Sequence, residues 1–412
     1  MSFLKSPVLK DSGVRRYLFA TFTSSVCWMM LATALGKHVY DVTGRELDLG
    51  LIGLAEFLPS FILVLVTGSV ADRFDRRKVM AIALLAEVFT AIGLAIYAAS
   101  DPTALWPFML LAAAFGTARA FVAPASRSMP GSIVDEHELP QLIALSSLSW
   151  QAATIFGPVL GGFLYLISPV VPYTTAAVLM FISAMLALTL TVRRQPERTD
   201  RPTLSTALEG LHFVRRTPIL LGGIALDLFA VLFGGAVALL PAITTDRLGL
   251  NSGGLGLLRA AGGAGAVLTG VVLAARPLRN TIGRILLISV AVFGVATIGL
   301  GLTKSWLVAA ICLFILQGAD MVSVFIRGTL VPLATPENMR GRVTAVEQVF
   351  IGASNELGAF ESGVAANSLG LVPAVVLGGV ATVAIVGIWW VAFPALRDVD
   401  TFDELLPATA SG

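Results

Sequence analysis

The sequence predicts an all-α integral membrane protein with twelve transmembrane helices. Of its 412 residues, 56% are hydrophobic and 13% are charged, whereas soluble domains carry roughly 25% charged residues. The mean hydropathy is +0.85. A helix needs about 20 apolar residues to cross a bilayer, and stretches of that length recur along the whole chain. The net charge of +2 is too small to indicate a nucleic-acid partner.

Twelve stretches are long and apolar enough to be spans, and one longer polar connection separates the sixth from the seventh. The predicted spans are 17–39, 49–71, 79–99, 105–123, 142–167, 173–192, 219–240, 255–275, 285–302, 306–331, 343–366 and 371–393. In the connection, Leu204, Leu208 and Leu211 have helical spacing, which is typical of a short amphipathic helix on a membrane surface. We therefore predict a six-helix bundle over 1–192, a cytoplasmic linker over 193–218, a second six-helix bundle over 219–393 and a cytoplasmic tail over 394–412.

The distribution of lysine and arginine predicts the orientation of the spans, because cytoplasmic loops are enriched in both residues. With both termini in the cytoplasm, cytoplasmic segments carry 21 of the 28 basic residues, and the outside loops carry three, Arg45, Arg247 and Lys304. The remaining four, Lys37, Arg119, Arg259 and Arg327, fall within spans. One miscounted span would reverse every later loop, so the ratio of 21 to 3 supports the span count.

The arrangement of six spans, a loop and six spans indicates an internal repeat. An offset of 201 residues pairs Gly157 with Gly358 and Arg119 with Asp320. Charges within the membrane thus fall at equivalent places in the two halves with opposite signs. An offset of 203 pairs Glu56 with Arg259 in the same way.

A charged stretch between the second and third spans carries the first resemblance to a known family. The segment "GSVADRFDRRKVM", residues 68–80, resembles the cytoplasmic signature of the major facilitator superfamily. Five residues match the signature: Gly68, Asp72, Arg73, Arg76 and Arg77. Asp75 replaces the signature's inner glycine. The resemblance implies two six-helix bundles with a central cavity and alternating access. It also implies a cytoplasmic gate, in which we expect Asp72 to contact the start of the eleventh span near Val343. The three arginines would then reach Asp135 or Glu136.

The fifth span resembles the G-P-x-x-G-G motif of drug:proton antiporters in that family, through Gly157, Pro158, Gly161 and Gly162. Proline permits a kink, and the glycines allow close approach of another helix. Residues 39–44, 227–243 and 340–363 resemble the family's enterobactin-exporter branch. Both similarities imply export of a solute.

Charged residues inside spans are candidates for a substrate or proton pathway, because each costs at least about 2.5 kcal/mol to insert. We expect Arg119 and Asp320 to face each other across the two halves, and Glu56 and Arg259 to form a second such pair. Asp227 has no basic neighbour in sequence and is the second candidate proton carrier after Asp320. Arg327, Glu356 and Glu361 complete the predicted pathway. Glu87 and Glu347 are expected to reach water or basic loop residues.

These features predict a secondary transporter of the cytoplasmic membrane that exports a small organic solute, either drug-like or siderophore-like, in exchange for protons. The alternatives are a symporter or facilitator that imports a nutrient, and a membrane receptor without transport activity on the same fold. No phosphate-binding loop, zinc-protease motif or nucleophile elbow indicates an enzyme. We expect no cofactor or metal, the lipid bilayer and a small molecule as partners, no nucleic acid, and a monomer.

Overall fold

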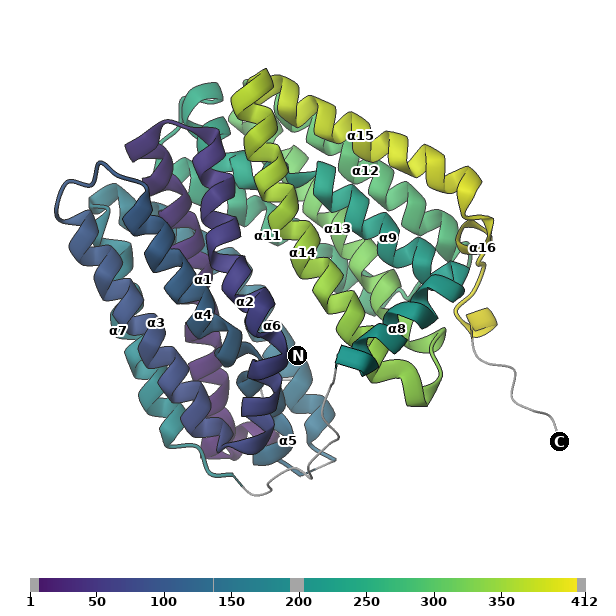
Figure 1. Cartoon of the computed structure of the whole chain (residues 1–412), viewed down its shortest axis with the longest axis horizontal. Helices are drawn as coiled ribbons and strands as arrows, with labels where there is room; N and C mark the ends of the chain where they lie inside the picture. The colour runs from purple at the N-terminus through teal and green to yellow at the C-terminus, as the bar shows by residue number, and fades with distance from the viewer. Residues whose placement is uncertain (1–6, 136, 193–203, 406–412) are drawn as a thin grey trace. The chain divides into compact units, whose positions relative to one another are not determined.

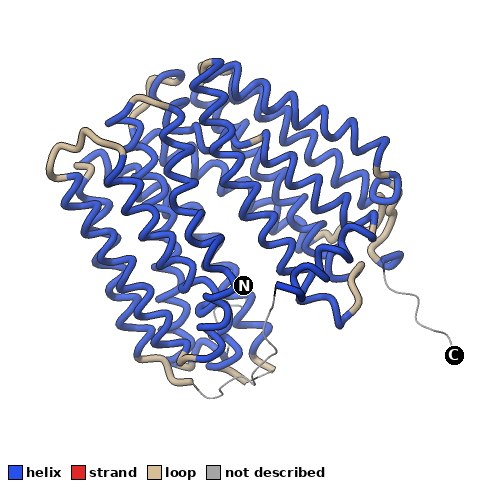
Figure 2. Tube along the Cα trace, in the orientation of Figure 1, coloured by secondary structure: helices blue, strands red, loops and turns tan. Residues whose placement is uncertain are grey.

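The computed structural model describes residues 7–135, 137–192 and 204–405. Within these ranges every regular element is helical, as Figure 2 shows, so the predicted all-α fold class is confirmed. Several sequence predictions fall on residues outside the described ranges: Glu136, the first part of the linker over 193–203, and the end of the tail after Leu405. The surroundings of Gly68 and the side chain of Asp72 also lie outside the described part.

Each of the twelve predicted spans falls on helix. In the described residues, eleven spans are single long helices: α1 (Ser12–Thr43), α2 (Glu46–Arg73), α3 (Arg76–Ala98), α4 (Trp106–Ser128), α6 (Leu139–Ile167), α7 (Val170–Leu188), α11 (Ser252–Ala275), α12 (Ile282–Leu302), α13 (Trp306–Leu333), α14 (Glu337–Leu369) and α15 (Leu371–Ala392). Short helices α5 (Pro130–Ile133), α8 (Leu204–Arg216) and α16 (Pro394–Arg397) lie between or after them. Most helices extend past the apolar stretch into flanking polar residues, because the backbone hydrogen bonds of a helix continue into residues that lie outside the hydrocarbon core.

The seventh span is interrupted, which the sequence analysis missed. Helix α9 (Pro218–Phe233) is followed by a 3-10 turn over Gly235–Leu239, by α10 (Leu240–Ala242) and by a π-helical turn over Ile243–Arg247. At the break, a Cβ on Gly235 would lie 2.5 Å from the carbonyl oxygen of Gly358 in α14. The backbones of α9 and α14 therefore approach at glycines, and Figure 1 shows the two helices side by side.

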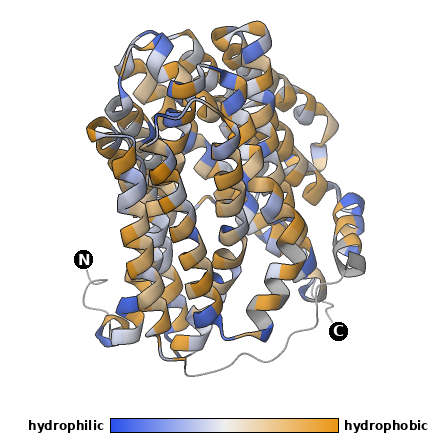
Figure 3. Cartoon of the chain, turned by 60° about the vertical axis from the view of Figure 1, so that its left-hand side comes forward, coloured by the Kyte–Doolittle hydropathy of each residue, from blue (hydrophilic) through white to orange (hydrophobic). Residues whose placement is uncertain are grey.

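Apolar residues cover most of the length of the helices, and hydrophilic residues gather near their ends (Figure 3). Ten helical segments of the described residues are long and apolar enough to cross a membrane. The other two predicted spans, α2 and α14, have 28 and 33 residues, which is ample length at 1.5 Å per residue. Helix α14 is less apolar because it carries Glu347, Asn355, Glu356 and Glu361.

The helices form two compact units. Unit 1 contains residues 1–44, 55–201 and 250–260, and unit 2 contains 45–54, 202–249 and 261–412. In unit 1, α1 packs on α6 and α7, and α3 packs on α4 and α7. In unit 2, α12 packs on α13 and α15, and α14 packs on α9. Unlike in the predicted division, the first residues of α2 belong to unit 2 and the first residues of α11 belong to unit 1.

Helix α8 packs on unit 2 through its apolar face. Val214 is 2% exposed and belongs to the core of that unit, with Leu211 and Phe213 packed against it. A Cβ on Gly210 would lie 2.8 Å from the carbonyl oxygen of Arg342 in α14, and Glu209 forms an ion pair with Arg342. Of the leucines that predicted an amphipathic helix, Leu211 packs on this core and Leu208 is 58% exposed, and the position of α8 on a membrane surface stays a prediction.

Candidate functional site

The predicted gating motif forms a short turn in which the unexpected aspartate caps a helix. Helix α2 ends at Arg73 and α3 begins at Arg76. The Asp75 carboxylate accepts a hydrogen bond from the backbone N–H of Arg77 at 3.0 Å and pairs with Nη2 of Arg77 at 2.7 Å. Hydrogen bonding to the Arg77 side chain lowers the pKa of Asp75. The residue that departs from the family signature therefore stabilises the start of α3.

The arginines of this motif connect α3 to other helices of unit 1. Arg76 donates to the carbonyl oxygen of Ser128 at 2.8 Å and to the Ser132 hydroxyl at 3.1 Å. Arg77 donates to the carbonyl oxygen of Leu190, just after α7, at 2.8 Å. Arg77 thus has partners other than the predicted Asp135 and Glu136, and Arg73 is exposed. The motif holds the end of this helix group together.

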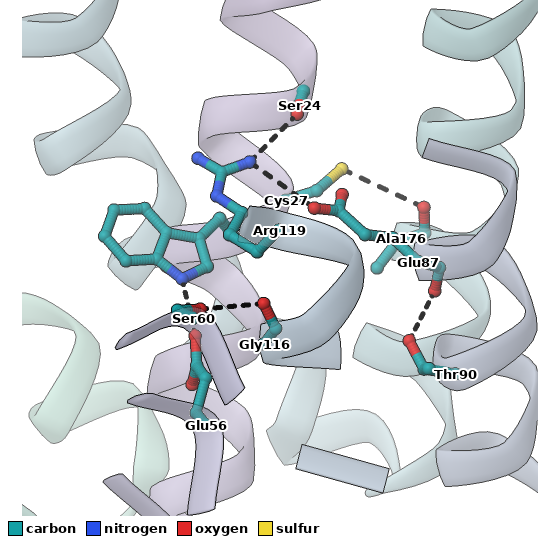
Figure 4. Close-up of polar contacts among 10 residues, drawn as sticks. Ser24, Cys27, Glu56, Ser60, Glu87, Thr90, Gly116, Arg119 and Ala176 are labelled. Atoms are coloured by element: carbon teal, nitrogen blue, oxygen red, sulfur yellow. Dashed lines mark hydrogen bonds and ion pairs between the residues drawn. The ribbon is translucent and has the colours of Figure 1, made fainter. Parts of the chain in front are cut away.

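Arg119 lies at the centre of a polar cluster inside unit 1. Its Nη1 is 3.7 Å from Oε1 of Glu87 in α3 and 3.3 Å from the hydroxyl of Ser24 in α1. Figure 4 shows the guanidinium between these two side chains. Its Cζ also lies 4.8 Å from the ring centre of Trp28, a cation–π contact. Arg119 therefore has its described partners within its own unit, and its pairing with Asp320 stays a prediction.

Glu87 is deeply buried, which corrects the expectation that it reaches water. Its exposed fraction is 0%, and neither carboxylate oxygen has a hydrogen-bond partner in the described structure. The 3.7 Å contact with Arg119 is an ion pair too long for a hydrogen bond. Glu347 is also buried, at 7% exposed. The cost of burying the Glu87 carboxylate is therefore offset by the charge of Arg119.

Glu56 joins this cluster through Trp28. The indole Nε1 of Trp28 donates to Oε1 of Glu56 at 3.0 Å, and the Trp28 ring stacks on Trp150 with ring centres 5.5 Å apart. Helices α2 and α4 are joined here, since the Ser60 hydroxyl donates to the carbonyl oxygen of Gly116 at 2.8 Å (Figure 4). Sequence reasoning missed both tryptophans. An indole N–H inside a span needs a hydrogen-bond acceptor, so a tryptophan there could have indicated a polar partner nearby.

Arg259 lies on α11 in the part that belongs to unit 1, and it does not form the predicted pair with Glu56. Its Nη1 donates to the Thr33 hydroxyl of α1 at 3.4 Å. Its Nε is buried and has no hydrogen-bond partner in the described structure. Glu56 and Arg259 thus each bond to α1, through Trp28 and Thr33 respectively.

The fifth-span motif packs α6 against the two helices that carry Thr33 and Arg259. Gly157, Pro158, Gly161 and Gly162 are all buried. A Cβ on Gly161 would lie 2.6 Å from the carbonyl oxygen of Met30 in α1, and one on Gly162 would lie 2.3 Å from that of Ser252 in α11. Real Cβ atoms do not approach backbone so closely, so both positions require glycine for this packing.

A second cluster lies inside unit 2 around Arg327. Nη2 of Arg327 is 2.6 Å from Oδ1 of Asp227, and its Nε donates to the Ser323 hydroxyl at 3.3 Å. Asp227 has no basic neighbour in sequence, but helix packing gives it a basic partner. Both members of the pair are buried, with 3% of Arg327 and 6% of Asp227 exposed. The two residues are 100 positions apart in the chain.

Asp320 borders this ion pair. It lines a small cavity of about 10 Å³ together with Asp227 and Ser323, which is the lower limit for one water molecule. Asp320 forms no ion pair within the described part of the chain, because Arg327 is already bound to Asp227. Two carboxyl groups thus border one cavity, and the guanidinium beside it is paired with Asp227 alone.

The remaining predicted pathway residues lie on α14. Glu361 is half-buried. Glu356 approaches the first part of α2, where a Cβ on Gly53 would lie 2.7 Å from its Oε2. A groove of about 630 Å³ between α3 and α7 is lined by apolar side chains and Thr174, without a charged group. Among the described residues no three His, Cys, Asp or Glu side chains could hold a metal ion.

Comparison with known proteins places these features in a family. The family model of the Major Facilitator Superfamily matches residues 17–359. An uncharacterized MFS-type transporter, YfiS of Bacillus subtilis, is 27% identical over 89% of this chain and 90% of its own length. The enterobactin exporter EntS of Escherichia coli is 28% identical over 83% of each chain.

Solved structures share the fold at low sequence identity. A bacterial homologue of the human lysosomal transporter Spinster, in an inward-facing and unoccupied conformation, has a TM-score of 0.74 at 15% identity over 98% of this chain and all of its own. The nucleoside transporter NupG has a TM-score of 0.68 at 14% identity over 93% of this chain and all of its own. The fold, the buried charged clusters and the family match agree: this chain is a multi-pass membrane transporter and belongs to the major facilitator superfamily.

Proposed function

We propose that this protein exports a small organic solute across the cytoplasmic membrane in exchange for protons. Export is supported by the relatives, since the EntS proteins are enterobactin exporters of 28% identity. It is also supported by the G-P-x-x-G-G motif of α6, whose glycines are all buried in helix contacts. The orientation that goes with this proposal has both termini in the cytoplasm, as the basic residues indicate.

The observation that carries proton coupling is the Asp227–Arg327–Asp320 cluster. Arg327 neutralises one carboxylate at 2.6 Å, and the second acid lines the same cavity without a cation of its own. An uncompensated carboxylate inside the membrane is costly, and binding a proton removes that cost. Asp320 is therefore the proposed proton carrier, and Asp227 holds Arg327 in place.

The energy available to such an exchanger is sufficient for efflux. One charge moved across 100 mV is worth about 2.3 kcal/mol, and one unit of pH difference adds about 1.4 kcal/mol. Together, roughly 3.7 kcal/mol per proton supports a solute gradient of several hundredfold. No cofactor or resident metal is needed for this reaction.

Flux in proteoliposomes tests the proposal, with enterobactin as the first probe and ethidium as a cationic alternative. We expect an imposed pH gradient to drive accumulation of at least one probe, and Asp320→Asn to abolish the response to the gradient. Asp101→Asn is the matched control, because Asp101 lies in a loop with φ of 51°, a conformation that asparagine also adopts. Transport that ignores the gradient, or is unchanged in Asp320→Asn, would remove proton coupling by this residue. Uptake in cells in place of depletion would favour a nutrient importer.

A further inference from the structure

Of the four basic side chains within the predicted spans, three form an ion pair with a carboxylate and Arg259 does not, within the described part of the chain. Lys37 forms an ion pair with Asp41, Arg119 forms one with Glu87, and Arg327 forms one with Asp227. Arg259 forms none within the described part of the chain. Its guanidinium has one described hydrogen bond, to the Thr33 hydroxyl at 3.4 Å, and its buried Nε has none.

A guanidinium without a carboxylate is an expensive feature at membrane depth. The other three cations show that this chain pairs such groups internally. The fork of five N–H donors on arginine matches a planar oxyanion, to which it can donate two parallel hydrogen bonds. The charge of Arg259 is therefore available to an anion that is not part of the described protein.

The packing around Arg259 is built to hold it in place. Gly162 of α6 touches α11 at Ser252 and Gly256, the latter three residues before Arg259. Gly161 touches α1 at Met30 and at Thr33, where its Cβ would lie 3.2 Å from Cβ of Thr33. The motif glycines thus fix the two helices that carry Arg259 and its only described partner. Thr33 is itself fixed, because it is 0% exposed and its hydroxyl also donates to the carbonyl oxygen of Met29 at 2.9 Å.

We propose that Arg259, supported by Thr33, binds the anionic group of the transported solute, which is a small organic anion. This inference rests on the proposed transport of an organic solute, and it names the solute's charge. The other two arginines in the spans do not serve this role, because Glu87 and Asp227 already neutralise them. The solute would carry a carboxylate or a comparable oxyanion, the group that the arginine fork binds with two parallel hydrogen bonds.

The test uses two probes that share an apolar body and differ in charge, 4-phenylbutyrate and 4-phenylbutyltrimethylammonium. Their binding to purified protein in detergent is measured by calorimetry without any proton gradient. We expect the wild type to bind 4-phenylbutyrate more tightly than the cation. Arg259→Gln should weaken binding of the anion at least tenfold and leave the cation unchanged. Arg259→Lys should retain part of the affinity, because lysine keeps the charge and loses the fork.

Two further variants separate binding from folding. Thr33→Val keeps the shape of the side chain and removes the hydroxyl. It should therefore weaken binding of the anion by a smaller factor than Arg259→Gln does. Lys304→Gln removes a basic residue from a loop and should change neither affinity. Equal affinity for the two probes, failure of both to bind, or unchanged anion binding in a folded Arg259→Gln protein would overturn the anion site. The binding measurement uses no gradient, so its result is independent of proton coupling. Anion binding that depends on Arg259, together with flux that does not respond to the pH gradient, would refute proton coupling and leave the anion site in place.

Discussion

At the scale of single residues, Arg119 and Arg327 are each compensated by a carboxylate within their own unit, whereas Arg259 and Asp320 form no ion pair within the described part of the chain. Arg119 illustrates the arrangement, with a carboxylate, a hydroxyl and an indole ring around one guanidinium. Glu87 depends on this one cation, because it is fully buried and its oxygens have no hydrogen bonds in the described structure. The two partners are therefore not equally dependent on each other.

This asymmetry predicts unequal effects of the two single substitutions. Arg119→Gln should lower the free energy of unfolding by about 3 kcal/mol, because it leaves a buried carboxylate uncompensated. Glu87→Gln should cost less, since Ser24 and the Trp28 ring still contact Arg119. The double variant should be more stable than the sum of the singles predicts, by about 1 kcal/mol or more. Denaturant titration of the purified protein measures all three.

Arg397→Gln serves as the control for this cycle, because its ion pair with Asp398 lies at the surface and such pairs contribute little. Additive effects of Arg119→Gln and Glu87→Gln would show that the two side chains do not interact in the folded protein.

Sequence reasoning located the charged residues but not the partners that they have within each unit. Counting charges within apolar spans found Asp227, Asp320, Arg119, Arg259 and Arg327, because an intramembrane charge is visible in composition alone. Partners depend on which helices pack together and on their rotation. The pair of Asp227 with Arg327 joins α9 to α13, and no local pattern reports that contact. Asp75 shows the opposite case, since its role as a helix cap is local and readable from its place before "RRK".

At the scale of helices, hydropathy predicted where the spans lie, because each apolar stretch must be long enough to cross the bilayer. The interruption of the seventh span was not predictable in this way. The sequence at Gly234 and Gly235 remains apolar through the break, and the cause lies in α14, whose Gly358 approaches it. Close backbone contacts at glycine are set by the partner helix, so a single sequence does not locate them.

The glycine motif of α6 gives a prediction at this scale. Gly162→Ala should destabilise the protein by about 1 to 3 kcal/mol, because the new methyl group would lie 2.3 Å from the Ser252 carbonyl oxygen and force α6 and α11 apart. The matched control is Gly387→Ala in α15, where nothing lies within 4 Å of the added Cβ. Alanine there should stabilise the helix by about 0.5 to 1 kcal/mol.

Thermal unfolding in detergent measures both substitutions. An unchanged or raised melting temperature for Gly162→Ala would show that α6 and α11 do not pack at these glycines.

At the scale of the whole molecule, the number of spans and the orientation of the chain depend on α2 and α14. Among the described residues, ten helical segments satisfy the length and hydropathy expected of a membrane span. Helix α2 includes side chains outside the described part, and helix α14 carries Glu347, Glu356 and Glu361, so the crossing of these two helices is the point to test. If α2 did not cross, the loop after it, at Phe74, would lie on the same side as the loop before it, at Arg45. The signature arginines would then be outside, against the bias of basic residues.

Cysteine labelling decides between these topologies. In a background with Cys27 and Cys312 replaced by alanine, single cysteines at Phe74, Asp101 and Lys304 are treated in intact cells with a membrane-impermeant maleimide. We expect Asp101→Cys and Lys304→Cys to react, because twelve spans place both loops outside, and Phe74→Cys to react only after the cells are opened. Asp398→Cys, beyond the last span, should also be protected in intact cells. Labelling of Phe74→Cys from outside would remove α2 as a span. Labelling of Asp398→Cys from outside, with Lys304→Cys also reactive, would show that α14 or another of the later helices does not cross.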